Sequence, residues 1–488
     1  MIATSFIALF MGFWAILYLS DVYLKTSLSS QGKYLDFIHK TGLSIYVCQI
    51  RWYSTCLNRQ FLRFGQWRKN FLKVWFTIGV VISLFFTFIS ITLLTLMIVN
   101  TLRKRPVEQQ VLTPVMPGVN IPTNQIGYYL LTLLVCGVLH EFGHAIAAVR
   151  EQVKIHGFGL FILAVYPGAF VDLSTEHLTN LSPLKQLRIY CAGVWHNIVL
   201  VILALVFRLI LPYILSVFYS TNASVVVTSI VLGSAVSGPR GLLVGDQITS
   251  LNNCRVRNIA QWTMCIEKTL SEKSTGYCVP AEFIKQYDIS QPNILKTMHG
   301  NVECCSNSSS THLCFSYFTK TTKVKPNYAC LPARSTSDRQ TCKLQSDCYK
   351  PNSPNFCTTP SLDNSTRLIR IVHTRRAPLL FLGHPLDLHY SLTLSDYTPR
   401  SSFVPVHAPY VLETIANYVI SLSGALALLN VVPCYALDGQ YILMAILELV
   451  LSPFLEKSSR LAIFTVILLF GTLLVATNVV IALWVLFH

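Results

Sequence analysis

The segment HEFGH, residues 140–144, contains the residues best suited to chemistry in this chain. On a helix, its four-residue spacing places His140 and His144 on one face, where both imidazoles can bind a single zinc ion. Glu141 lies beside them and can act as a general base. The number of chance HExxH matches expected from this composition is on the order of one in a hundred, so the motif favours a zinc hydrolase. The alternative is a polar hydrogen-bonding cluster between helices, which needs no such spacing.

A third zinc ligand must come from elsewhere, because catalytic zinc takes three protein ligands and a water. Asp438 is the best candidate, since it ends a long apolar run in NVVPCYALDGQ, residues 430–440. Pro433 is expected to break the helix there, and Gly439 would permit an unusual backbone that aims the carboxylate inward. The alternative is an ordinary helix-end residue at the membrane interface.

The elements that position these residues are predicted to be membrane-spanning helices, because 52% of the 488 residues are hydrophobic and only 12% are charged. Six apolar runs have a length near or above the roughly 18 residues of a spanning helix; they cover residues 2–19, 74–102, 126–149, 189–218, 414–437 and 461–487. The run 126–149 is interrupted by HEFGH, and the run 189–218 by His196 and Arg208. Ionisable groups are costly at membrane depth, so these interruptions indicate function. His196 is expected to pack between helices or to support a metal ligand.

The distribution of charge predicts the topology. Residues 25–73 hold nine Lys or Arg and one acid, Asp36, which places this loop in the cytosol. The basic cluster 103–105 would also prefer the cytosol and argues against this topology. Residues 2–19 lack the basic region and cleavage site of a signal peptide, so a retained anchor is expected. The formal charge of +16 is concentrated in loops, and we expect no direct nucleic-acid partner.

Ten of the fifteen cysteines lie between residues 254 and 357, in a polar stretch. An even number packed this closely predicts a disulfide framework in an oxidising compartment. Zinc binding is the alternative, although the stretch has no CxxC pair. Glycosylation sequons at Asn222, Asn307 and Asn364 agree with a lumenal location, whereas the sequon at Asn180 would lie on the other side and stay unmodified.

The order of these features predicts four regions. A short apolar run at 157–173, too short to span and broken by glycines and a proline, resembles a re-entrant hairpin, and an interfacial loop is an equal alternative. Strand-like sequence flanks the cysteine-rich stretch on both sides. The predicted regions are two anchor helices with a basic cytosolic loop (1–102), a membrane core with HEFGH, hairpin and fourth span (103–218), a β-rich lumenal domain (219–408) and two final spans (409–488).

The two motifs together lead to a known family. HEFGH in one span and Asn430, Pro433, Leu437, Asp438 and Gly439 in a later one resemble the site-2 protease family of intramembrane metalloproteases. The resemblance continues through YPGAFVDL, QLRIYCAGVWHN, GPRGLLVGD, GHPLDLHY and SLSGALALLNVVPCYALDGQ, and so covers nearly the whole chain. One departure is that the linker 103–125 lacks the long serine run of some family members.

The resemblance implies roles for five residues. His140, His144 and Asp438 would bind one Zn²⁺ per chain, and Glu141 would be the catalytic base of a zinc metalloendopeptidase. Asn197, in GVWHN, matches a family position that orients the substrate or polarises the scissile carbonyl. A hydrogen bond between helices is the alternative role for Asn197. The active site would lie close to the cytosolic face.

The fold and biology implied by the resemblance are those of a polytopic α-helical membrane protein with about six transmembrane helices. Its lumenal PDZ-like β-rich domain would carry the cysteine-rich insertion and act as a size filter or docking surface. The substrates would be membrane-anchored transcription factors in sterol and endoplasmic-reticulum stress signalling, such as sterol regulatory element-binding protein precursors after a first lumenal cut. The protein would reside, in contact with membrane lipid, in the Golgi or the endoplasmic reticulum.

Three other functions are weighed against this one. A transporter could use the buried His, Glu and Asp side chains as an ion pathway. A protease of the prenyl-protein processing type shares HExxH but uses a glutamate as the later ligand, and no such second motif is present here. A non-catalytic lumenal scaffold would leave HEFGH unexplained.

Overall fold

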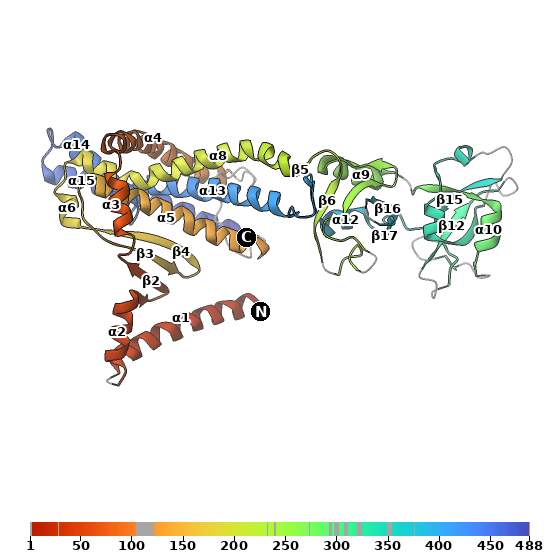
Figure 1. Ribbon diagram of the computed structural model, residues 1–488, viewed down its shortest axis with the longest axis horizontal. Coiled ribbons are helices and arrows are strands. Elements are labelled where there is room, and N and C mark those ends of the chain that lie inside the picture. The colour runs from red at the N-terminus through yellow and green to blue at the C-terminus, as the bar shows by residue number, and fades with distance from the viewer. Residues whose placement is uncertain are drawn as a thin grey trace. The chain divides into compact units, whose positions relative to one another are not determined.

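A computed structural model describes most of the chain (Figure 1), namely residues 2–27, 29–103, 121, 123–231, 233–238, 241–272, 274–291, 295–296, 302–306, 311–319, 325–348, 354–374 and 376–487. It forms two compact units. Unit 1 comprises Met1–Leu209 and Leu412–His488, and unit 2 comprises Ile210–Val411. Most of the linker 103–125 and the sequon at Asn307 lie outside the described residues.

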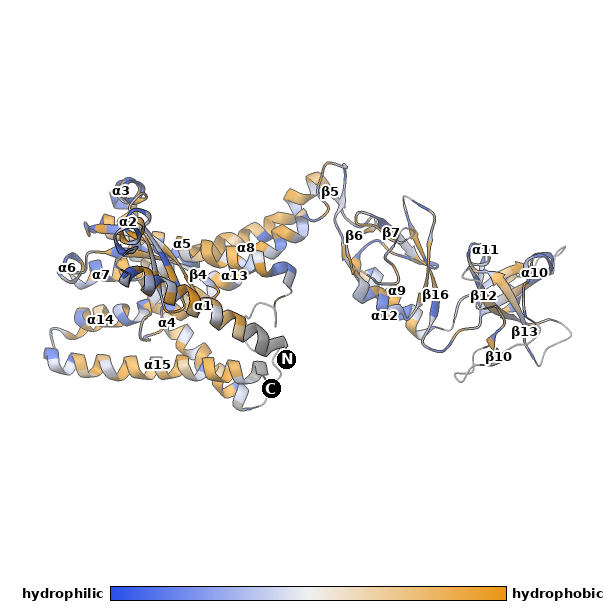
Figure 2. Ribbon diagram, turned by 90° about the horizontal axis from the view of Figure 1, so that it is seen from below, coloured by the Kyte–Doolittle hydropathy of each residue, from blue (hydrophilic) through white to orange (hydrophobic). Residues whose placement is uncertain are grey.

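Six helices of the described chain are long and apolar enough to cross a membrane. They are α1 (Ile2–Thr26), α4 (Lys69–Leu102), α5 (Ile126–Arg150), α8 (Ala192–Phe218), α13 (Ala408–Asn430) and α15 (Lys457–Phe487). Hydrophobic residues dominate α8 and α15 along their length (Figure 2). A helix satisfies its own backbone hydrogen bonds, as a segment in lipid must. The six predicted spans are thus confirmed as six apolar helices.

Short helices connect the long ones in unit 1. They are α2 (Gln31–Thr41), α3 (Asn58–Gln66), the 3₁₀ turn η2 (Thr123–Gln125), α6 (Thr175–Thr179), α7 (Pro183–Tyr190) and α14 (Asp438–Leu451). The prediction that Asp438 ends the fifth span is wrong, because α13 ends at Asn430 and Asp438 is the first residue of α14. The backbone turns between the two helices, where Pro433 cannot continue α13 and Ala436 adopts φ +67°.

Small residues let the helices of unit 1 approach one another closely. Ala147 of α5, Ala192 of α8 and Ala427 of α13 are buried in one apolar cluster. Gly143 of α5 faces α8, where an added Cβ would lie 2.8 Å from His196 Nδ1. Small residues at such contacts are typical of helices that pack inside a membrane.

A four-stranded antiparallel sheet lies against α5 in unit 1 (Figure 1). Its strands, in spatial order, are β1 (Leu43–Tyr46), β2 (Gln49–Ser54), β3 (Ile155–Leu163) and β4 (Tyr166–Leu173). The structure forms a hairpin over residues 157–173, one of the two alternatives for this run, but its pairing with two strands from the basic loop 25–73 was not predicted. Phe61 of α3, which belongs to this loop, packs against the rings of Phe142 in α5 and Phe158 in β3.

Unit 2 contains a six-stranded sheet. The strands are β17 (Leu379–Gly383), β16 (Arg367–His373), β7 (Gln247–Leu251), β6 (Val225–Ile230) and β18 (Leu392–Ser395), with β8 (Cys254–Arg255) paired to β7. Two helices pack on this sheet, α9 (Ile259–Ser271) and α12 (Pro385–Ser391). Val225 and Val227 of β6, Ile369 of β16 and Trp262 of α9 form its buried core.

A second sheet of unit 2 is inserted in the chain between α9 and β16. Its strands, in order, are β13 (Asn327–Pro332), β12 (His312–Tyr317), β15 (Asn355–Pro360), β9 (Gly276–Pro280) and β14 (Thr341–Cys342). Its helical turns are α10 (Ala281–Tyr287), α11 (Ala333–Ser337) and η3 (Gln345–Cys348). Two small strand pairs complete unit 2, β10 (Leu295–Lys296) with β11 (Val302–Glu303) and β5 (Tyr219–Ser220) with β19 (Thr398–Pro399).

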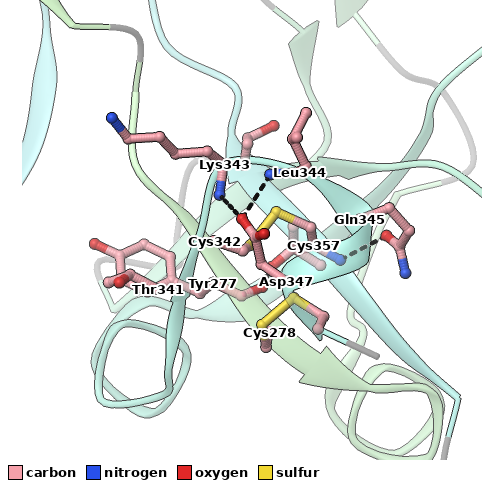
Figure 3. Close-up of a disulfide and its surroundings, with 12 residues drawn as sticks. Tyr277, Cys278, Thr341, Cys342, Lys343, Leu344, Gln345, Asp347 and Cys357 are labelled. Atoms are coloured by element: carbon pink, nitrogen blue, oxygen red, sulfur yellow. Dashed lines mark hydrogen bonds between the residues drawn. A yellow bond between two sulfur atoms is a disulfide. The ribbon is translucent and has the colours of Figure 1, made fainter. Parts of the chain in front are cut away.

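The ten clustered cysteines form five disulfides: Cys254–Cys265, Cys278–Cys348, Cys304–Cys314, Cys305–Cys330 and Cys342–Cys357. The first bridges the six-stranded sheet to α9, and the other four lie in the inserted region. Figure 3 shows the adjoining bridges of Cys278 and Cys342, whose sulfur atoms lie within 4.8 Å of each other and of Cys348. Each sulfur already belongs to a bridge, so the oxidised group offers no thiolate to a metal. Beside them, Asp347 accepts hydrogen bonds from the backbone N–H groups of Leu344 and Lys343, which lower the pKa of its carboxyl group.

Candidate active site

Three side chains from α5 and α14 converge at one point inside unit 1. Asp438 Oδ2 lies 2.9 Å from His140 Nε2 and 3.2 Å from His144 Nε2, and the two Nε2 atoms are 3.2 Å apart. Ligands about 2.0–2.1 Å from a tetrahedral zinc ion would be about 3.3–3.4 Å from one another. The separations of the three donor atoms therefore fit a zinc site with little rearrangement.

A glycine keeps space open beside the three donor atoms. Gly193, at the start of α8, faces the imidazoles, and an added Cβ would lie 2.6 Å from His140 Nε2. The same Cβ would also overlap His144 Nε2. Any larger residue at this position would occupy the space where a metal ion and its open coordination position belong.

His144 is oriented by a backbone carbonyl. Its Nδ1 lies 2.7 Å from the carbonyl oxygen of Ile189, in the last turn of α7. Only a protonated Nδ1 can donate to that oxygen, so in the neutral ring Nε2 keeps its lone pair, which points at Asp438 and His140. This is the arrangement found around metal-binding histidines, whose second nitrogen donates to a carbonyl or carboxylate.

His140 is contacted by Asn197 of α8. The Asn197 amide nitrogen Nδ2 lies 3.1 Å from His140 Nδ1, and Asn197 is fully buried. Within the described residues, Asn197 Oδ1 has no hydrogen-bond partner. If the amide is turned so that Oδ1 faces the ring, it accepts from Nδ1–H and leaves His140 Nε2 free for a metal. The structure thus places Asn197 where it can orient His140.

Glu141 lies between α5 and the sheet. Its Oε2 accepts a hydrogen bond of 3.0 Å from the backbone N–H of Val171 in β4. Because β4 is an edge strand, this N–H has no partner within the sheet. The carboxylate is therefore held beside the histidines but belongs to no pair with a basic side chain among the described residues.

Asp438 is held in place by close packing around the loop between α13 and α14. Gly439 lies so near the carbonyl of Val432 that a Cβ would overlap it, and Gly471 of α15 is equally close to the carbonyl of Pro433. Gly439 was expected to provide an unusual backbone conformation, but the positive φ is at Ala436. Gly439 instead allows close approach, which brings the carboxylate to the histidines.

Sequence reasoning did not identify three residues of this site. Ile189 and Val171 contribute backbone groups, and any residue type supplies those. Gly193 acts by the absence of a side chain, and only its place before His196 and Asn197 in a motif distinguished it from other glycines.

Comparison with known proteins agrees with this geometry. The sequence profile of Peptidase family M50 matches residues 128–474. The chain belongs to this family, the site-2 protease family. The matched range includes His140, Glu141, His144, Asn197 and Asp438.

A curated relative covers most of this M50 peptidase. The "Membrane-bound transcription factor site-2 protease homolog" of Arabidopsis thaliana is 28% identical over 454 residues, which are 80% of this chain and 83% of the relative. Family membership and the six apolar helices support an intramembrane metalloprotease in a multi-pass membrane protein. These findings favour a metalloprotease over the transporter and over the non-catalytic scaffold.

Proposed function

We propose that this M50 peptidase is a zinc metalloendopeptidase that cleaves membrane-anchored transcription factor precursors within a transmembrane segment. The observation that carries the proposal is the convergence of His140, His144 and Asp438 beside Glu141. Two imidazoles and a carboxylate within 4.8 Å of one another are a donor set typical of zinc hydrolases.

The site residues divide the chemistry between them. His140, His144 and Asp438 would hold one zinc ion, which when bound supplies a Lewis acid for the peptide carbonyl and the attacking water. Glu141 takes a proton from the attacking water while the water oxygen forms a bond to the carbonyl carbon. It then returns the proton to the leaving amine as the C–N bond breaks. Asn197 orients His140, and direct contact with the scissile carbonyl is the other role that mutants can test.

The edge of β4 is proposed to bind the substrate as an added strand. A substrate helix hides its carbonyls in hydrogen bonds, so it must unwind before it is cleaved. The outward N–H of Val171 now bonds Glu141, and a substrate carbonyl that took this N–H would free Glu141 to act as the base. Because α5 packs against β4, the substrate must separate the two elements to reach this edge.

The proposed substrates rest on the Arabidopsis relative, and the proposed compartment rests on the disulfide-bonded cysteines. The name of the Arabidopsis relative supports membrane-bound transcription factors as substrates, among which we include sterol regulatory element-binding protein precursors after a first lumenal cut. The five disulfides and the exposed sequons Asn222 and Asn364 support a lumenal location for unit 2. We therefore propose that the protein resides in the Golgi or the endoplasmic reticulum, with its active site near the cytosolic face.

Unit 2 is proposed to select substrates. Its six-stranded sheet with α9 and α12 supports a PDZ-like domain, and its insertion adds a second, disulfide-bonded body. Such a body on the lumenal side could exclude precursors that still carry large lumenal domains, and so enforce the order of the two cuts.

The proposal is tested with the purified full chain in liposomes that contain a membrane-anchored substrate. Removal of metal by a chelator should abolish cleavage, and zinc should restore it. Glu141→Gln should retain zinc but lose about 10²- to 10⁴-fold in rate, because this substitution removes the base and leaves the three metal ligands in place. Asp438→Asn should lose zinc and cleavage together. Full activity in Glu141→Gln, or normal zinc content with normal cleavage in Asp438→Asn, would overturn the assigned roles.

A further inference from the structure

An ion pair is buried in unit 1, outside the group of metal-binding side chains. Arg188 of α7 donates from Nη1 to Glu151 Oε1 at 3.0 Å, and only 8% and 5% of the two side chains are exposed. Arg188 also donates from Nε to Thr77 Oγ1 of α4 at 3.0 Å. Thr77 in turn donates to the carbonyl of Lys73 at 2.7 Å. Arg188 thus joins three elements: α7, α4 and the residue directly after α5.

This ion pair lies one residue from the carbonyl that orients His144. Arg188 precedes Ile189, and Glu151 follows His144 by seven residues, or about two turns of helix. Side chains seven residues apart share a helix face. The helix α7 therefore contacts one face of α5 at two points, the 2.7 Å contact of His144 Nδ1 with Ile189 and the ion pair of Arg188 with Glu151.

Two polar contacts oppose movement of α7 along α5. Leu187 and Tyr190 also hold α7 by apolar packing with α4 and α14, but such packing is not directional. A displacement of about 1 Å would lengthen the 2.7 Å hydrogen bond to Ile189 beyond its useful range. The ion pair opposes this movement, because a buried guanidinium group that leaves Glu151 and Thr77 has no water to replace them.

We propose that the Arg188–Glu151 ion pair, anchored to Thr77, is a positioning device that holds the Ile189 carbonyl on His144 and thereby sets the metal affinity of the site. This inference rests on the proposed zinc function. Glu151 and Arg188 act through α7 and touch neither metal nor substrate. Their substitution should alter metal binding before it alters any chemical step.

Metal affinity distinguishes this role from a purely structural one. Arg188→Lys can still pair with Glu151 but lacks the Nε–H that bonds Thr77. We expect Arg188→Lys and Glu151→Gln to weaken zinc binding by about 10- to 100-fold, measured by competition with a chelator. The absorption spectrum of the Co²⁺-loaded protein should change as well, because it reports the geometry around the metal.

A matched control removes another buried carboxylate of unit 1. Asp21 of α1 pairs with Lys25 at 2.7 Å and is 3% exposed, but it lies on neither α5 nor α7. Asp21→Asn should lower stability without changing the zinc affinity or the Co²⁺ spectrum. A similar loss of affinity in Asp21→Asn would show that any buried defect weakens the site, and would overturn the proposal.

Substitution of Thr77 provides a second test, because it changes neither Arg188 nor Glu151 and so leaves no buried charge without its partner. Thr77→Val removes the hydroxyl that anchors Arg188, whereas Thr77→Ser keeps it. Zinc affinity should fall in Thr77→Val and stay at the wild-type value in Thr77→Ser. Equal affinities in the two variants would overturn the positioning role, even if the Arg188 variants fail to fold. A wild-type chain that binds no zinc would instead refute the proposed function itself.

Discussion

At the scale of residues, the donor atoms are held by contacts from several different elements. The Ile189 carbonyl of α7 holds His144, Asn197 of α8 contacts His140, and the loop before α14 holds Asp438. Each contact restricts one ring or carboxylate to the orientation that points its donor atom at the shared centre. The affinity of the site should therefore depend on side chains and backbone groups that never touch the metal.

Gly193 offers a sharp test of the space at this centre. Gly193→Ala adds a Cβ that overlaps both His140 Nε2 and His144 Nε2, so one imidazole must move. Overpacking of this kind costs about 1–3 kcal/mol, which corresponds to a loss of roughly 5- to 150-fold in zinc affinity. Zinc content and cleavage should fall together when they are measured on the same preparation.

The control for Gly193→Ala is another glycine in a membrane helix. Gly127 of α5 has open space where its Cβ would lie. Gly127→Ala should bind zinc and cleave substrate as the wild type does. Normal zinc binding in Gly193→Ala would show that the imidazoles do not hold a metal in the arrangement described here.

The sequence named the side chains that the structure brings together at the candidate site, but not the contacts that orient them. HEFGH and Asp438 could be found because imidazoles and carboxylates are rare in apolar runs. The carbonyl of Ile189 and the N–H of Val171 could not, since every residue carries such groups and only the fold determines which ones meet a side chain.

At the scale of elements, the edge strand β4 has a property that bears on substrate binding. Residues two apart in a strand direct their N–H groups to the same side. The N–H of Ala169 therefore points the same way as the N–H of Val171, away from β3. The N atom of Ala169 faces α5 at Gly137, where even an added Cβ would be 3.9 Å away. At Gly137, therefore, α5 presents no side chain to this N–H, although Ala169 itself is buried in a cluster with Val138 and Phe142 of α5.

Ala169→Pro should weaken substrate cleavage while leaving the sheet intact. Proline removes the outward N–H of residue 169 but no hydrogen bond to β3. The loss of one main-chain hydrogen bond, worth about 0.5–1.5 kcal/mol, should lower kcat/KM by roughly two- to twelvefold. Phe170→Pro removes an inward N–H and should destabilise the hairpin. Unchanged kcat/KM in a folded Ala169→Pro chain would exclude this edge as the substrate site.

The elements that could be predicted are those whose signal is local. Six apolar runs became six helices because hydropathy acts over a single segment. The pairing of β2 with β3 joins Gln49 to Leu163, a contact across more than a hundred residues that no local pattern reveals. The helix α14 was missed because its apolar residues follow the fifth span almost without interruption.

At the scale of the whole molecule, the free and the bridged cysteines lie in different units. Unit 1 contains the five free cysteines, Cys48, Cys56, Cys136, Cys191 and Cys434, and unit 2 contains all five disulfides. A chain exposed to two redox compartments would show this division. It agrees with the basic loop 25–73, which predicts the cytosol for the other side of the membrane.

Glycosylation should follow the same division. We expect glycan at one or more of Asn222, Asn307 and Asn364 and none at Asn180, although Asn180 is also exposed. Variants that keep a single sequon, treated with a glycosidase and compared by electrophoresis, provide the measurement. Modification at Asn180 alone would place unit 2 in the cytosol.

Cys56 allows the topology to be tested from the opposite side of the membrane. Cys56 is exposed and free, and it lies in the basic loop predicted to be cytosolic. In sealed vesicles with the cytosolic face outward, a membrane-impermeant maleimide should label Cys56 without detergent, because a charged reagent reaches only the outer face. Cys56→Ser should remove most of this label, since Cys48 is half-buried and the other free thiols are buried.

The ten cysteines of unit 2 should react only after the vesicles are permeabilised and the disulfides reduced. If Cys56 instead requires permeabilisation, the basic loop faces the lumen, and the active site would have to be assigned to the other side of the membrane.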